Sequence, residues 1–127
     1  MTYTLSQKSL DRLKGVHPDL VKVVKRAIEL TEQDFVVLEG LRTLERQRYL
    51  LKKGATKTLK SRHIVGKAVD LVPVVDGRIS WDWKYYWPIV EAMSKAAEEL
   101  EAPIEHGAHW KKFPDAPHHQ LPSKHYP

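Results

Sequence analysis

The chain has 127 residues and a formal net charge of +5; 42% of its residues are hydrophobic and 29% are charged. These values are typical of one globular domain that buries its own core. Cysteine is absent, which excludes disulfide bonds and thiolate zinc sites. No apolar run approaches the roughly 18–20 residues of a membrane span, so we expect no stable membrane insertion.

The first part of the chain predicts two helices. Ser6 is a suitable N-cap for a short helix that extends to Lys14, and Pro18 suits the first turn of a second helix. Apolar residues continue the second helix at helical spacing to about Leu30. These residues are Leu20, Val23, Val24, Ala27 and Ile28.

A strand and a third helix are predicted next. Residues 35–38 form an apolar run of strand type that ends at Gly40. Thr43 could cap a helix through Lys53, and Gly54 would close it. Three leucines of this helix are expected to face inward: Leu44, Leu50 and Leu51. Residues 55–62 are interpreted as a basic loop.

The second half predicts a hairpin. Residues 68–75 are rich in valine and leucine, as expected for a buried strand that ends near Pro73. Asp76 and Gly77 form a strong turn signal, so residues 78–79 are expected to pair back.

A long helix and two closing strands complete the predicted fold. Pro88 fits the first turn of this helix, because proline further inside would break it. Its apolar face is expected to hold Ile89, Val90, Met93, Ala96, Ala97 and Leu100. Residues 103–106 and 118–121 read as short strands. The fold class is therefore α+β, a small antiparallel sheet with three main helices and a metal site at the sheet.

Four residues suggest that metal site. His63, Asp70 and His118 could supply two imidazoles and a carboxylate as ligands, and Asp115 lies three residues before the last of them. Three ligands with a nearby base are the inventory of a catalytic zinc site. A separation of seven places His63 and Asp70 on opposite faces of a straight strand, so they share an ion only if the chain bends, and Gly66 would allow this. The spacing alone is compatible with a metal site without requiring one.

The pattern Ser61-x-His63-x-x-Gly66-x-Ala68-x-Asp70, followed by Asp115-x-x-His118, resembles the zinc peptidases of the D-alanyl-D-alanine carboxypeptidase family. More narrowly, it resembles their bacteriophage branch, the L-alanyl-D-glutamate endopeptidases that serve as endolysins. The segments at residues 39–43 and 107–110 are also similar to motifs of that family.

The resemblance implies a role for each residue of these motifs. His63, Asp70 and His118 would bind Zn²⁺, and Asp115 would be the catalytic carboxylate. Arg42 would contact the substrate or the developing oxyanion. Ser61 and Trp110 are further candidates for substrate binding, and Trp110 and the prolines beside Asp115 could supply the partly dry pocket that raises a carboxyl pKa.

Several residues depart from the family pattern or have an open role. His109 stands where relatives often have aspartate, and His119 where an aromatic residue commonly follows the ligand. The histidines at 106, 109, 119 and 125 are interpreted as solvated or as groups supporting the site. Three tryptophans, Trp81, Trp83 and Trp87, are predicted to pack at the core and its rim, with a shelf for a sugar or a peptide stem as the alternative.

These observations predict a zinc-dependent endopeptidase that cleaves the L-alanyl-D-glutamate bond of peptidoglycan stem peptides. We expect residues 1–127 to form a single catalytic domain and a monomer, without a separate wall-binding domain. The chain would be made in the host cytoplasm without a signal peptide and would reach the wall at lysis. Two alternatives remain: a D-alanyl-D-alanine carboxypeptidase with the same site, and a basic nucleic-acid-binding module, for which no recognition motif is present.

Overall fold

The computed structural model describes residues 2–56 and 61–127, so part of the predicted basic loop lies outside the described residues. The first two helices begin at their predicted caps. Helix α1 (Gln7–Arg12) follows Ser6, whose side chain accepts a hydrogen bond from the Ser9 backbone N–H. Helix α2 (Pro18–Leu30) starts at Pro18, and the predicted apolar stripe is buried along its length.

Within the part of the chain that the structure describes, five short strands form one antiparallel sheet. They are β1 (Phe35–Glu39), β2 (Ala68–Val75), β3 (Arg78–Ile79), β4 (Glu105–His106) and β5 (His118–Gln120). The order is β1-β2-β5-β4, and β3 pairs with the far end of β2. The turn at Asp76 and Gly77 joins β2 to β3 as predicted. Pro73 was expected near the end of its strand, but β2 continues past it to Val75, and the Pro73 carbonyl accepts a hydrogen bond from the Ser80 N–H.

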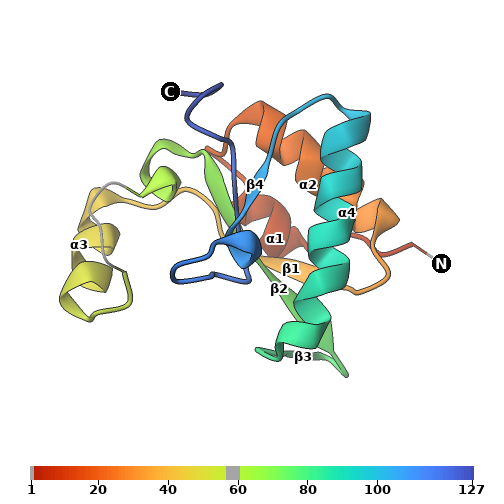
Figure 1. Ribbon diagram of the computed structural model, residues 1–127. Helices are drawn as coiled ribbons and strands as arrows, with labels where there is room; N and C mark the ends of the chain where they lie inside the picture. Colours follow the sequence, from red (N-terminus) through yellow and green to blue (C-terminus); the bar gives the residue numbers. More distant parts are fainter. Residues whose placement is uncertain (1, 57–60) are drawn as a thin grey trace.

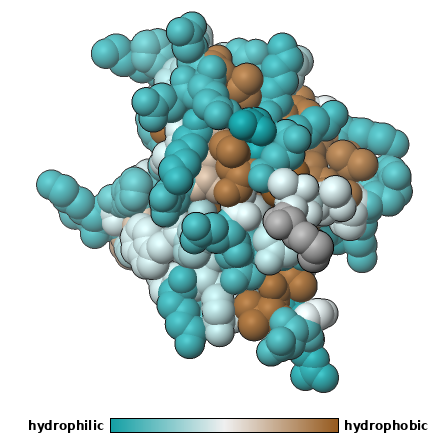
Figure 2. All heavy atoms as spheres, turned by 90° about the vertical axis from the view of Figure 1, so that its right-hand side faces the viewer, coloured by the Kyte–Doolittle hydropathy of each residue, from teal (hydrophilic) through white to brown (hydrophobic). Residues whose placement is uncertain are grey.

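The core lies between the sheet and three helices. Helix α4 (Tyr86–Glu99) packs against α2 and β2, and α1 packs against β1. Figure 1 shows these helices together, with α3 (Leu44–Lys52) standing apart from them. On the face drawn in Figure 2, hydrophobic residues form separate patches between hydrophilic side chains. Within the described residues, no helix combines the length and apolar character needed to cross a membrane.

Two predictions about apolar faces are wrong. Leu44 and Leu51 of α3 are exposed, because this helix does not pack on the main core; its buried side chain is Gln47. Leu100 was expected on the inner face of α4 but is exposed, because it is the C-cap residue, where the helix has ended.

Candidate metal centre

Strand register brings polar residues of three strands into one row. Asp70 of β2 lies opposite His118 of β5 and, on its other side, opposite Glu39 of β1. Residues directly opposite each other in an antiparallel pair have their side chains on the same face, about 4.5–5.5 Å apart at Cβ. The pairing of β2 with β5 therefore places the Asp70 carboxylate beside the His118 imidazole.

His63 reaches this row from a short 3₁₀ helix, η1 (Arg62–Val65), that precedes β2. Ser61 is its N-cap and accepts a hydrogen bond from the His63 N–H. Gly66 closes η1 with φ 69°, a left-handed conformation that glycine adopts at little cost. The bend that the odd spacing requires is thus located at Gly66, and His63 and Asp70 face the same side.

One oxygen of Asp70 lies at the centre of the cluster. Its Oδ1 is 3.2 Å from His63 Nε2 and 3.4 Å from His118 Nδ1. The ligand atoms that these three residues can offer lie within 4.8 Å of one another, so the cluster could hold a metal ion. Two imidazole nitrogens and one carboxylate oxygen suit a borderline metal such as zinc.

The second nitrogen of each imidazole has its own partner. His63 Nδ1 is 2.9 Å from the Gly40 carbonyl oxygen, and His118 Nε2 is 2.8 Å from Gln120 Oε1. Both partners are acceptors, so those nitrogens carry the protons and donate. When such a ring is neutral, its other nitrogen is unprotonated and faces the cluster, which is the tautomer that metal binding requires. When the ring is protonated, the same nitrogen donates to the Asp70 carboxylate.

The charges of the cluster support one another. Burial alone would raise the pKa of the Asp70 carboxyl, but hydrogen bonds from His118 and His63 lower it well below its ordinary value. Burial would lower the pKa of His118, but the hydrogen bond and charge of Asp70 outweigh burial and raise it. Asp70 is therefore ionised at neutral pH.

Arg42 is held rigidly beside this row. Its guanidinium donates to both carboxylate oxygens of Glu39, at 2.6 and 2.7 Å, and to Gln47 Oε1 at 2.7 Å. Its Nη2 is 3.9 Å from Asp70 Oδ2. A bidentate pair of this kind fixes the plane of a guanidinium. Glu39 and Arg42 both lie in a motif identified from the sequence, but the sequence did not predict that they pair. It also did not predict that Gln47 accepts a hydrogen bond from the Arg42 guanidinium.

Asp115 lies in the loop before β5. Burial raises the pKa of its carboxyl, and the negative charge of Asp70 raises it further. Its backbone N–H donates to the Gly107 carbonyl, 2.8 Å away. A Cβ on Gly107 would collide with the Asp115 carbonyl oxygen and lie 2.9 Å from His118 Cβ, so this close approach requires glycine.

The three candidate ligands lie in one cleft of about 790 Å³. The predicted site residues Arg42, Ser61, Trp110 and Asp115 line it together with the three candidate ligands. The Trp110 ring lies 5.1 Å from that of His118. Glu39, Trp81 and Pro117, which the sequence analysis also drew on, line the cleft as well. The structure adds residues that the sequence did not suggest for the site: Leu38, Leu50, Ala55, Thr56, Arg62 and Gln120.

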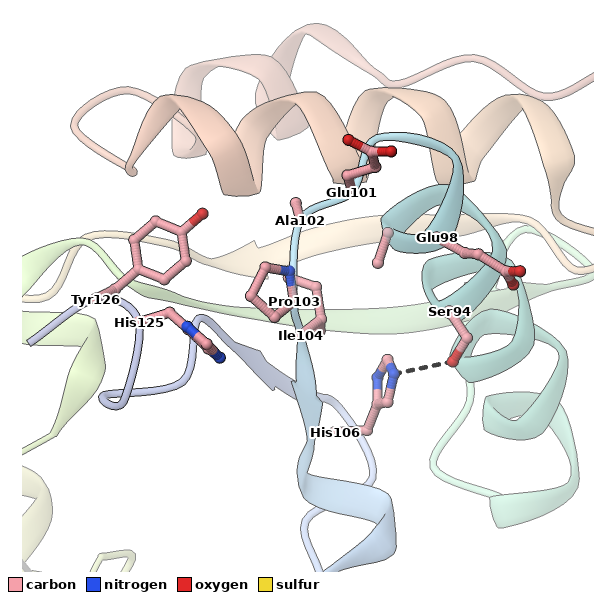
Figure 3. Close-up of a pocket in the computed structure, with 10 residues that line it drawn as sticks. Ser94, Glu98, Glu101, Ala102, Pro103, Ile104, His106, His125 and Tyr126 are labelled. Atoms are coloured by element: carbon pink, nitrogen blue, oxygen red, sulfur yellow. Dashed lines mark hydrogen bonds between the residues drawn. The ribbon is translucent and has the colours of Figure 1, made fainter.

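A second cleft, between α4 and the C-terminal segment, contains none of the candidate ligands. Figure 3 shows His106 pointing across it to Ser94, with His125 and Tyr126 on the facing segment. His106 Nε2 is 3.0 Å from Ser94 Oγ, and His106 Nδ1 is 2.8 Å from His119 Nδ1.

His119, which follows His118 on β5, thus points away from the cluster and pairs with His106 of β4. Burial and the charge of His109 lower the pKa of His106 to about 4, and burial lowers that of His119 well below its ordinary value.

This buried histidine pair should make the protein sensitive to acid. The unfolded chain takes up a proton at His106 near pH 6.5, but the folded chain does so only near pH 4. Stability is therefore greatest above pH 6.5 and falls as the pH drops toward 4, by up to about 3 kcal/mol from this group. Urea unfolding of metal-free protein between pH 7 and 4.5 should show the decline. His106→Gln should make the decline shallower, with the remaining slope due to His119, and the exposed control His125→Gln should leave it unchanged. An equally steep decline in His106→Gln and the wild type would contradict this assignment.

The fold and the cleft define an α+β protein with a candidate His–Asp–His metal centre. Its sequence matches the family described as phage L-alanyl-D-glutamate peptidase over residues 1–123, so the chain belongs to that family. The L-alanyl-D-glutamate peptidase of Escherichia phage T5 is 33% identical over 119 residues, which span 91% of this chain and 87% of the relative.

Two further relatives extend the comparison. The L-alanyl-D-glutamate peptidase of Listeria phage A118 is 25% identical over 129 residues, a match that covers 99% of this chain and 45% of that protein. The crystal structure of the Serratia marcescens L-Ala D-Glu endopeptidase ChiX superposes with a TM-score of 0.91 at 44% identity, covering 95% of this chain and 91% of that one. The similarity therefore extends over nearly the whole fold.

Proposed function

We propose that this protein is a zinc-dependent endopeptidase that hydrolyses the L-alanyl-D-glutamate bond of peptidoglycan stem peptides. The observation that carries the proposal is the His63–Asp70–His118 cluster with the Asp115 carboxyl in the same cleft. Membership of the phage peptidase family and the similarity to ChiX support the same bond as the target.

The residues of the cluster fit zinc. Three protein ligands are the number that catalytic zinc sites use, and the Gly40 and Gln120 oxygens favour the imidazole tautomers that metal binding needs. Zinc bound by His63, Asp70 and His118 would supply the Lewis acidity that activates water and polarises a peptide carbonyl. The single carboxylate limits the negative charge that the protein places next to the metal.

Asp115 is proposed as the general base and acid. Its carboxylate would accept a proton from the attacking water and later deliver it to the nitrogen of the leaving D-glutamate. A raised pKa suits both steps, because proton transfer is most effective when the pKa of the group lies near the working pH.

Arg42 is proposed to stabilise the oxyanion that forms from the alanyl carbonyl. Glu39 and Gln47 hold the guanidinium in place, and it has two further N–H groups that can donate to an oxygen in the cleft. The Ser61 hydroxyl and the Trp110 ring are proposed to position the peptide. The Ser61 oxygen already accepts from His63 N–H, so its own hydrogen is available for a substrate oxygen.

The biological role that we propose is host lysis by a phage. Residues 1–127 would act as one monomeric catalytic domain on the wall after release from the host cytoplasm. The net charge of +5 would favour contact with anionic wall polymers.

Mass spectrometry of digested peptidoglycan tests this function. Purified peptidoglycan is incubated with the protein, with added zinc and in parallel after chelation. We expect zinc-dependent release of stem peptides that begin with D-glutamate, while L-alanine stays on the glycan. Free alanine as the product would instead indicate a D-alanyl-D-alanine carboxypeptidase, and the absence of any zinc-dependent product would reject both peptidase activities.

A further inference from the structure

Trp81, which lines the cleft, and a row of three exposed rings, Trp83, Trp87 and His109, are together called the aromatic shelf. The tryptophans have relative exposures of 63%, 39% and 46%, so they do not belong to the core. The rings of Trp83 and Trp87 are 5.7 Å apart, and that of His109 stacks on Trp87 at 6.0 Å. The stacked rings thus join the first turn of α4, and the segment before it, to the end of η3 (Gly107–His109).

The shelf is continuous with the candidate site. Trp81 lines the same cleft as His63, Asp70 and Asp115. Trp110, which follows His109, also lines it and contacts His118. A molecule that lies with its reacting bond at the cluster can therefore extend over Trp81 without leaving the cleft.

The elements that contribute to the two sides of the cleft differ in character. Leu50 of α3 lines one part, and α3 carries exposed cations at Arg46, Arg48 and Lys52. Trp81 lines another part of the cleft. Trp81 follows shortly after β3, and Figure 1 shows β3 well away from α3. The cationic side suits the carboxylates of a stem peptide, whereas large uncharged rings suit an uncharged ligand with an apolar face.

The chemistry of the proposed substrate supplies such a ligand. In a stem peptide, the L-alanine before the target bond is attached through a lactyl group to N-acetylmuramic acid. One residue and a lactyl group span about 7 Å, because an extended residue spans about 3.3–3.6 Å. The sugar must therefore lie close to the rim of the cleft, and the C–H face of a pyranose ring packs well on an aromatic face.

We propose that the aromatic shelf is a subsite for the glycan, with Trp81 under the N-acetylmuramic acid that bears the peptide. Trp83, Trp87 and His109 continue the surface for the neighbouring sugars of the strand. This inference rests on the proposed function, and it makes the enzyme selective for stem peptides that are still attached to glycan.

Two soluble substrates with the same stem peptide test the subsite. One is a muropeptide that carries the disaccharide, and the other is the sugar-free peptide. We expect the wild-type protein to have a higher kcat/KM for the muropeptide. Trp81→Ala should reduce the ratio of the two kcat/KM values about five- to tenfold, and Trp81→Phe should restore part of it. Tyr3→Ala, which removes an exposed aromatic ring outside the cleft, should leave the ratio and both rates unchanged.

A binding measurement accompanies the kinetics. Tryptophan fluorescence should respond to the peptide-free disaccharide in the wild-type protein, and the response should be lost in Trp81→Ala. If the wild type cleaves both substrates and Trp81→Ala lowers both kcat/KM values equally, or neither, the glycan subsite is wrong and the proposed function stands. If the wild type cleaves neither substrate with zinc present, the proposed function fails and the subsite fails with it.

Discussion

Replacing Asp115 with asparagine is expected to lower kcat by about 10²–10⁴-fold, the usual contribution of a general acid–base group. Asparagine keeps the shape of the side chain but cannot accept the proton of the attacking water. The protein should still bind zinc, because the three proposed ligands are unchanged. Steady-state hydrolysis of a stem peptide and the zinc content of the purified variant would give both results.

Asp34→Asn is a matched control for this change. Asp34 is also half-buried, and burial raises the pKa of its carboxyl, but it does not line the cleft. Its replacement should leave kcat unchanged. Loss of zinc from Asp115→Asn would make Asp115 a ligand instead of a base, and full activity would remove it from the mechanism.

The pH dependence of the wild type gives a second view of Asp115. A general base must be ionised, so kcat should fall as the pH drops through the pKa of this group. In the metal-free protein, burial and the charge of Asp70 raise that pKa above the ordinary aspartate value of about 3.9. Bound zinc would lower the pKa by its positive charge, so the limb in the loaded enzyme reports the balance of these effects.

The parts of the fold that depend on local sequence could be predicted well. Ser6 and Thr43 cap their helices as predicted, because a hydroxyl accepts a hydrogen bond from an N–H three residues later. The helical spacing of apolar residues in α2 and the turn at Asp76 and Gly77 are equally local. Each of these signals involves only a few neighbouring residues.

Predictions about burial failed where a segment has no partner in the core. Leu44 and Leu51 have helical spacing, but spacing does not say whether another element will cover the face, and nothing buries these two side chains. The tryptophans present the same difficulty, because large aromatic residues occur both in cores and at binding surfaces.

The candidate ligands could be found from a motif, but the groups that orient them were harder to find. Gln120 follows His118 by two residues on a strand, so alternation alone places both on one face, and this signal was available. The Gly40 carbonyl and the pairing of His119 with His106 depend on strand register and on η1, which bring together residues far apart in the sequence.

Removal of one ligand is the other change with a large expected effect. His118→Ala should abolish zinc binding and reduce hydrolysis to background, because two remaining ligands hold zinc poorly and Asp70 loses one of the two imidazoles beside its Oδ1. Zinc that binds only the folded state stabilises by about 2.7 kcal/mol at a concentration 100 times Kd. The wild type should therefore gain stability when zinc is added to metal-free protein, and His118→Ala should gain none.

The gain on adding zinc, measured by urea unfolding, separates this role from packing. His118 is largely buried, so His118→Ala will also be less stable without metal, but that loss affects both arms of the comparison equally. His125→Ala removes an exposed histidine outside the cluster and should keep the full gain. An equal gain in His118→Ala and the wild type would mean that zinc binds elsewhere, and the proposed centre would then have to be abandoned.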